Sequence, residues 1–201
     1  MNRRQFLRGG AALAPLALPA PGRSAEPLTR AAPVPFFVPP QPPLEAKGAI
    51  DIRVLVRSSA TGGVYSSVET AVAPKRMGPA PHAHQDLDEL MFVLEGTASV
   101  LMEDEVIEVP AGGWHLRPRR IKHTFWNAAG RPLRFIDMYF NPPFEDYLEQ
   151  IFHRLTAENG YPDGSDKKRA EVLRLTEKFG IIRFPDGQEQ RQDLMKRYGL
   201  T

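Results

Sequence analysis

Two histidines separated by one residue, His82 and His84, are the residues of this chain best suited to chemistry. They stand in PHAHQDLDELMFVLEG, residues 81–96, where Glu89 follows His84 by five positions. Side chains two apart in an extended strand project from the same face, so both imidazoles can reach one ion. Two imidazoles and a carboxylate suit a divalent transition metal, namely manganese, iron, nickel, copper or zinc.

A further histidine, His123, is the candidate for a fourth ligand. It stands in GWHLRPRRIKHTFWN, residues 113–127, where Pro118 rigidifies a turn and His123 begins a strand. For the histidines at 115 and 153, a structural or surface role is the favoured interpretation. The sequence therefore predicts a site drawn from two separate segments.

Both stretches resemble the two motifs of the cupin family. The first motif is matched at His82, His84, Glu89 and Gly96. The second motif is matched at Gly112, Pro118, His123 and Asn127. Two positions depart from the pattern, because Gly78 lies nearer to the first histidine than the family's glycine does, and Arg120 replaces an inner glycine. The resemblance extends over roughly residues 50–140.

The resemblance implies a single cupin-type barrel, also called a double-stranded β-helix or jelly-roll, with a metal inside it. The implied metal ligands are His82, His84, Glu89 and His123. The C-terminal part, from NPPFEDYLEQIF to GIIRFP, also resembles the helical extension of small single-cupin proteins called quercetin dioxygenase-like.

The elements that must position these residues are short strands. IDIRVLVR, residues 50–57, alternates apolar and polar residues, and further β-rich runs follow at about ten-residue spacing up to Phe140. Gly, Pro and Asn separate the runs, which favours a β-sandwich or small barrel. In one run, Glu89 shares its face with Met91 and Val93.

After Asn141 the apolar period becomes helical. One stripe consists of Phe144, Tyr147, Leu148, Ile151, Phe152 and Leu155. Gly160 is expected to close this helix, a second helix is expected over about 165–179, and the tail predicts a short third one. The predicted fold class is all-β with C-terminal helices, with a β domain at 48–140 and a helical extension at 141–201.

The first 25 residues are predicted to be a signal peptide. The pair Arg3-Arg4 and the apolar run to Ala20 resemble a twin-arginine signal, and the run is too short for a membrane span. We therefore expect a periplasmic or secreted protein with no stable membrane insertion after signal removal. Residues 26–47 are rich in proline and predict an extended arm, laid across the domain through Phe36 and Phe37.

Composition excludes several classes of function. The chain has no cysteine, which excludes disulfides, thiolate metal sites and a cysteine nucleophile. The net charge is +2, and removal of four arginines with residues 1–25, which contain no acid, leaves 2 − 4 = −2. The basic charge is thus poor evidence for nucleic acid, and no nucleic-acid partner is expected.

Three imidazoles and one carboxylate leave two positions of an octahedral ion open. The sequence therefore predicts an exported, metal-dependent, dioxygenase-like enzyme acting on a small phenolic, enol or dicarbonyl compound. Glu89, the ligand with spare acceptor capacity, is also the candidate base. The alternatives are a non-redox binding protein or isomerase with a Lewis-acid metal and, less favoured, a barrel that its metal only stabilises. A homodimer through edge strands is a further hypothesis.

Two features near the site have open interpretations. Met91, Val93, Phe125 and Tyr139 are either a pocket wall around the ion or plain core. The basic run Arg117–Lys122 is either a rim that steers an anionic substrate inward or, as we favour, a solvated loop.

Overall fold

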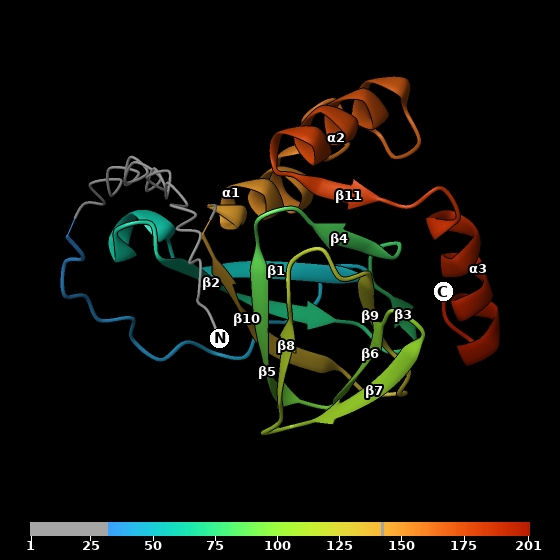
Figure 1. The fold of residues 1–201 in the computed structure, drawn as a ribbon, viewed down its shortest axis with the longest axis horizontal. Coiled ribbons are helices and arrows are strands. Elements are labelled where there is room, and N and C mark those ends of the chain that lie inside the picture. The colour runs from blue at the N-terminus through green and yellow to red at the C-terminus, as the bar shows by residue number, and fades with distance from the viewer. Residues whose placement is uncertain (1–31, 142) are drawn as a thin grey trace, which may run out of the picture.

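The computed structural model describes residues 32–141 and 143–201. The predicted signal peptide and the first residues of the predicted arm lie outside the described residues. Two antiparallel sheets face each other, residues 144–183 lie at one end of them, and the last helix lies along one side (Figure 1).

The first sheet, called sheet A, contains five strands. In spatial order they are β1 (Ile50–Val56), β2 (Tyr65–Val72), β10 (Leu133–Phe140), β5 (Asp88–Glu95) and β8 (Trp114–Arg117). A 3₁₀ turn, η1 (Ser58–Thr61), joins β1 to β2. Glu89 lies on β5 of sheet A, and the strands on either side of β5 are β10 and β8.

The second sheet, called sheet B, supplies the histidines. Its order is β11 (Ile181–Arg183), β4 (His82–His84), β9 (His123–Asn127), β6 (Thr97–Met102) and β7 (Glu105–Pro110), and β3 (Arg76–Met77) pairs with β9. The predicted strands between 48 and 140 are confirmed.

The core lies between the sheets. In β5 the buried residues are Glu89, Met91 and Val93, while the alternate residues remain partly exposed, as the period-2 pattern predicts. The main apolar cluster consists of Val72, Met91, Val93, Ala98, Val100, Val109, Leu133 and Phe135. Met91 and Val93 are therefore core residues, which was one of the two interpretations of these positions.

Gly96 links β5 to β6 in a left-handed conformation, with φ +81°, and a Cβ built on it would lie 2.6 Å from the Pro132 carbonyl oxygen. We expect Gly96→Ala to lower the free energy of unfolding by about 1–3 kcal/mol for the left-handed backbone, and further for the clash. Gly112→Ala is the matched control, because φ is +85° there and no atom lies within 4 Å of the added Cβ. Urea denaturation of both variants measures the difference, and equal losses would show that the contact with Pro132 does not matter.

The C-terminal extension contains helices and one strand. Helix α1 (Phe144–Glu149) continues into a π-helical turn, η2 (Gln150–Arg154), and is followed by α2 (Asp166–Lys178) and α3 (Gly187–Tyr198). The all-β class with C-terminal helices is thus confirmed. The first helical stretch ends at Arg154, however, and Gly160 does not close it.

Strand β11 was not expected from the sequence. It is only three residues long and pairs with β4, with Ile181 opposite His84 and Arg183 opposite His82. A run of three residues carries no periodic signal, and its pairing partner lies about a hundred positions earlier. The extension therefore supports the strand that carries two of the candidate ligands.

The described part of the arm, residues 32–47, contains no regular secondary structure. It contacts sheet A through Pro42, whose carbonyl oxygen accepts a hydrogen bond from Arg53 (2.8 Å), and through the Leu44 N–H, which donates to Glu69 (3.3 Å). Phe37 is 82% exposed. The expected attachment through the phenylalanines is therefore wrong, because backbone hydrogen bonds hold the arm instead.

Glu69 is buried on sheet A between Arg53 and Arg134. Burial acts to raise the pKa of Glu69, but hydrogen bonds from Arg134, Arg53 and Leu44 outweigh it and lower the pKa below 4.5. Because the folded state holds the lower pKa, the stabilisation is present above pH 4.5 and is lost as pH falls through the lowered value.

We therefore expect Glu69→Gln to lower the free energy of unfolding at pH 7 by about 1–3 kcal/mol, since charged partners lose their acceptor. The difference in unfolding free energy between this variant and the wild-type protein should shrink as the pH approaches 3. Urea denaturation at both pH values measures this, and a gap independent of pH would contradict the assignment.

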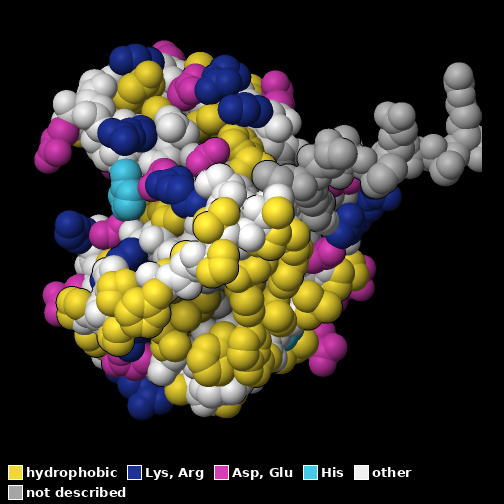
Figure 2. Space-filling model, turned by 90° about the vertical axis from the view of Figure 1, so that its left-hand side faces the viewer, with side chains coloured by type: hydrophobic (Ala, Val, Ile, Leu, Met, Phe, Trp, Pro, Cys, Tyr) yellow, Lys and Arg dark blue, Asp and Glu magenta, His cyan; other side chains and the backbone are white. Residues whose placement is uncertain are grey.

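The surface combines charged helices with an apolar sheet face. Hydrophobic side chains cover much of the β-sheet part in Figure 2, and charged ones gather around the helical part above it. Among the exposed apolar residues are Trp114 (56%) and Leu116 (54%) on the edge strand β8, where Trp114 packs against Phe92. None of the helices in the described ranges is both long and apolar enough to cross a bilayer.

Candidate metal centre

Three imidazoles meet between the sheets. His82 and His84 project from one face of β4, and His82 lies opposite His123 in the β4–β9 register. Their ring centroids are 4.7–5.4 Å apart, and one ligand nitrogen from each lies within 4.8 Å of the other two. The structure thus brings together the three histidines that the spacing singled out. We call them the histidine triad.

Backbone carbonyls orient two of the triad rings. Nδ1 of His82 lies 3.0 Å from the Ala80 carbonyl oxygen, and Nδ1 of His123 lies 2.9 Å from that of Ile121. A hydrogen bond to a carbonyl requires the proton on Nδ1, which leaves a lone pair on Nε2 for a metal. Nε2 of His123 and both ring nitrogens of His84 are buried without a hydrogen-bond partner in the described part of the chain.

Glu89 approaches the triad from sheet A. Its Oε2 lies 2.9 Å from Nε2 of His123, and its Oε1 lies 3.4 Å from Nε2 of His84. It borders two of the three imidazoles, while the mutually close group of ligand atoms consists of the triad alone. Three side chains from β4 and β9 are therefore close enough to hold one ion, and Glu89 of β5 borders them.

The charges around the site favour the protonation states that a metal needs. Burial, reinforced by the neighbouring His123 and His84, lowers the pKa of His82 to about 3. Burial acts to raise the pKa of Glu89, but the charge of Arg117 and the adjacent imidazoles hold it well below 4.5. At neutral pH the site offers a neutral imidazole at His82 and a carboxylate at Glu89, which are the forms that bind metals.

Access to the triad is one-sided. His84 and His123 are almost completely buried, whereas His82 is partly exposed. The ring of Phe144, from α1, lies edge-on to His84 with centroids 4.9 Å apart. The C-terminal extension therefore covers the His84 side, and among the three imidazole residues only His82 keeps exposed surface.

The basic residues of the run Arg117–Lys122 do not all lie on one surface. Arg117 is 1% exposed and points inward to Asp137 and Glu89, whereas Arg119 pairs with Asp88 at the surface. The favoured interpretation, a solvated loop, is wrong for Arg117. Reasoning from the sequence missed Arg117 and Asp137; the available signal was an aspartate at an inward position of the apolar strand LRFIDMYF.

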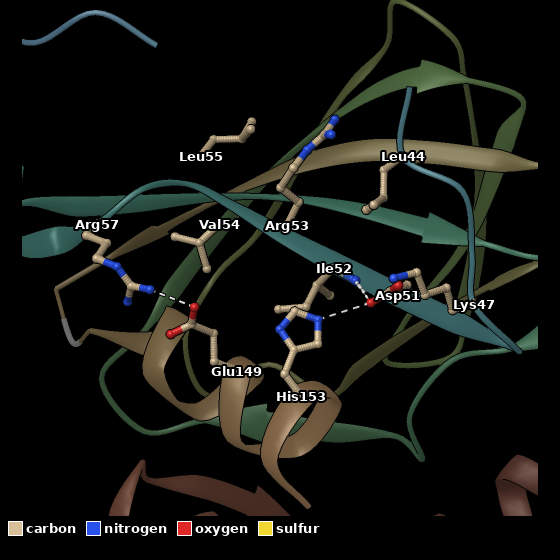
Figure 3. Close-up of a pocket in the computed structure, with 10 residues that line it drawn as sticks. All are labelled: Leu44, Lys47, Asp51, Ile52, Arg53, Val54, Leu55, Arg57, Glu149 and His153. Carbon is tan, nitrogen blue, oxygen red and sulfur yellow. Dashed lines mark hydrogen bonds and ion pairs between the residues drawn. The ribbon is translucent and has the colours of Figure 1, made fainter. Parts of the chain in front are cut away.

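Two further histidines lie outside the triad. His115 faces inward from β8, half-buried, with its Nδ1 unpartnered in the described part of the chain. His153 lies in η2 and borders a groove of about 450 Å³ between the arm, β1 and the π-helical turn (Figure 3). Its Nε2 lies 3.1 Å from Asp51 Oδ1, which cross-links η2 to β1.

Part of the chain matches a known protein family. Residues 68–139 match the family model of the cupin domain, and this range includes the triad and Glu89. The uncharacterized protein MJ1618 of Methanocaldococcus jannaschii is 26% identical over 102 residues, which are 51% of this chain and 81% of that protein.

Solved structures with a similar fold include KdgF from Halomonas sp. (TM-score 0.45, 18% identity, covering 52% of this chain and 91% of that one). Another is the oxalate decarboxylase of Lactobacillus farciminis (TM-score 0.42, 20% identity, covering 47% and 30%).

Proposed function

We propose that His82, His84, His123 and Glu89 bind one divalent transition metal, which is iron, manganese, nickel, copper or zinc. The observation that carries this proposal is the set of buried nitrogens of His84 and His123 that lack any hydrogen-bond partner in the described ranges. Unpaired buried polar atoms are unfavourable, and a metal at the triad would bind Nε2 of His123 and one of the two ring nitrogens of His84. The close carboxylate of Glu89 supplies a fourth, anionic ligand.

The proposed activity is that of a metal-dependent, dioxygenase-like enzyme acting on a small phenolic, enol or dicarbonyl compound. A bound redox metal with two free positions would supply activation of dioxygen and polarisation of the substrate oxygen. The chain itself orients the imidazoles, excludes water on the Phe144 side and leaves the His82 side for the substrate. Export through the twin-arginine route, to the periplasm or the medium, is part of this proposal and is supported by the Arg3-Arg4 signal pattern.

The lowered pKa of Glu89 bears on its role. A carboxylate held ionised by Arg117 is a good ligand but a weak base. The structure therefore favours Glu89 as a ligand over Glu89 as the candidate base. The second function, a non-redox binding protein or isomerase, is also compatible with this role. A Lewis-acid metal requires the four ligands but does not require Glu89 to act as a base.

Metal analysis followed by an oxygen-consumption screen tests these functions. The mature protein, loaded in turn with each of the five metals, is expected to bind about one ion and to consume oxygen with a flavonol or a β-diketone. The His84→Ala variant is the control and should do neither. Tight zinc binding without oxygen consumption on any substrate would support the non-redox function, and absence of metal binding would contradict both.

The homodimer stays a prediction. Analytical ultracentrifugation of the same protein measures its oligomeric state.

A further inference from the structure

Arg117 is a charged side chain enclosed between the sheets, beside the histidine triad. It is 1% exposed and lies opposite Glu89 in the β5–β8 register. Its Nη2 forms an ion pair with Asp137, and its Nε lies 3.4 Å from Oε2 of Glu89. The guanidinium carbon lies 5.8 Å from the ring centroid of Phe125. Arg117 therefore bridges two buried carboxylates and has almost no contact with solvent.

Burial of an arginine side chain is not an effective way to stabilise a fold. Removing a guanidinium from water costs several kcal/mol, and a well-packed apolar side chain is often as stabilising as a buried ion pair. Both oxygens of Asp137 are engaged, Oδ1 by Arg117 and Oδ2 by the Tyr139 hydroxyl, which donates at 3.2 Å. This arrangement fixes the guanidinium in one orientation, as a positioning role requires.

Glu89 lies on the middle one of three adjacent strands. In sheet A, β5 lies between β10 and β8, with Tyr139 opposite Glu89 on one side and Arg117 opposite it on the other. Oε2 of Glu89 has no hydrogen-bond partner with good geometry in the described part of the chain. The charged group that contacts this oxygen is the Arg117 guanidinium, so the ion pair with Arg117 is what holds the carboxylate beside the triad.

We propose that Arg117, held in place by Asp137, is a positioning residue that fixes the Glu89 carboxylate against His84 and His123 as a preset metal ligand. This inference rests on the proposed metal-binding function. Without the guanidinium, the Glu89 side chain would sample several rotamers, and the two carboxylates would remain buried without their shared cation. Metal affinity would then fall, because an outer partner that orients a ligand typically contributes 10–100-fold.

Cobalt(II) binding measures this role without reference to catalysis. The dissociation constant for Co²⁺ is obtained by competition with a chromophoric chelator, and the visible absorption of bound Co²⁺ reports its coordination. We expect Arg117→Met to weaken binding about 10–100-fold and to shift the spectrum toward that of Glu89→Gln. The double variant should bind no more weakly than Glu89→Gln alone, because Arg117 acts through Glu89. Arg117→Lys should restore part of the loss.

Arg134→Met is the matched control, since Arg134 forms its ion pairs with Glu69 and Glu95 away from the triad. It should leave affinity and spectrum unchanged. Asp137→Asn, which loosens the guanidinium without removing it, gives an independent test if Arg117→Met does not fold, and should weaken binding in the same direction.

The outcomes separate the two proposals. Wild-type Co²⁺ affinity and spectrum in both Arg117→Met and Asp137→Asn would overturn the positioning role while leaving the metal site intact, and so would losses that add in the double variant. Failure of the wild-type protein to bind Co²⁺ or any other tested metal would overturn the proposed function, and this inference with it.

Discussion

Replacing His84 with alanine is expected to abolish metal binding. His84 is fully buried, and neither of its ring nitrogens has a hydrogen-bond partner in the described ranges, so the imidazole has no other polar role there. Loss of a ligand should exceed the ~100-fold that loss of an outer partner produces, which corresponds to about 2.7 kcal/mol. Equilibrium dialysis followed by elemental analysis should show metal content falling from about one ion per chain to near zero.

The control for this prediction is another histidine. His153→Ala removes an imidazole that is paired with Asp51 of β1 and is not a member of the triad, so metal content should not change. Retention of a full equivalent of tightly bound metal by His84→Ala would show that the triad is not the binding site. Parallel loss in both variants would point to general unfolding, which circular dichroism detects.

Replacing Phe144 with alanine is expected to cause the largest loss of stability. Its ring is 4% exposed, stacks on Tyr147 with centroids 5.0 Å apart, and packs against Tyr139 at 5.0 Å and His84 at 4.9 Å. Truncation of a buried phenylalanine removes about 3–5 kcal/mol of unfolding free energy, through lost burial and the cavity left behind. Urea denaturation in the presence of a chelator measures this without a contribution from metal binding.

Phe37→Ala is the matched substitution, because Phe37 is 82% exposed. Its effect should stay within about 0.5 kcal/mol. We also expect Phe144→Ala to weaken metal binding, since the ring supports His84. A small stability loss in Phe144→Ala, comparable with that of Phe37→Ala, would mean that α1 does not pack on the sheets as described.

Local patterns were sufficient to predict most strands and the proximity of His82 and His84. The alternation in DELMFVLE placed Glu89, Met91 and Val93 on one buried face, and the structure confirms that face. The His-x-His spacing placed two imidazoles together because strand geometry repeats every two residues. The approach of His123, which lies thirty-nine positions after His84, came from the resemblance and not from periodicity.

The C-terminal extension makes contacts that local sequence patterns did not predict. Its apolar stripes predicted α1 and α2, and Ser165 caps α2 by accepting a hydrogen bond from the Lys168 N–H. The same stripes did not reveal that Phe144 packs on a candidate ligand or that residues 181–183 extend sheet B. Both contacts join segments that are far apart in the chain, so neither leaves a periodic trace.

The amino-acid sequence by itself determined the class of fold and the residues able to bind a metal, because both depend on spacing within short segments. Only the tertiary structure decided the surroundings of that site: β11 beside β4, Phe144 against His84, and the guanidinium of Arg117 between Glu89 and Asp137. Arg117 stands in a basic run that looks solvated. Its burial follows from the inward face of β8 and from an aspartate on β10 that can neutralise it, which are non-local facts.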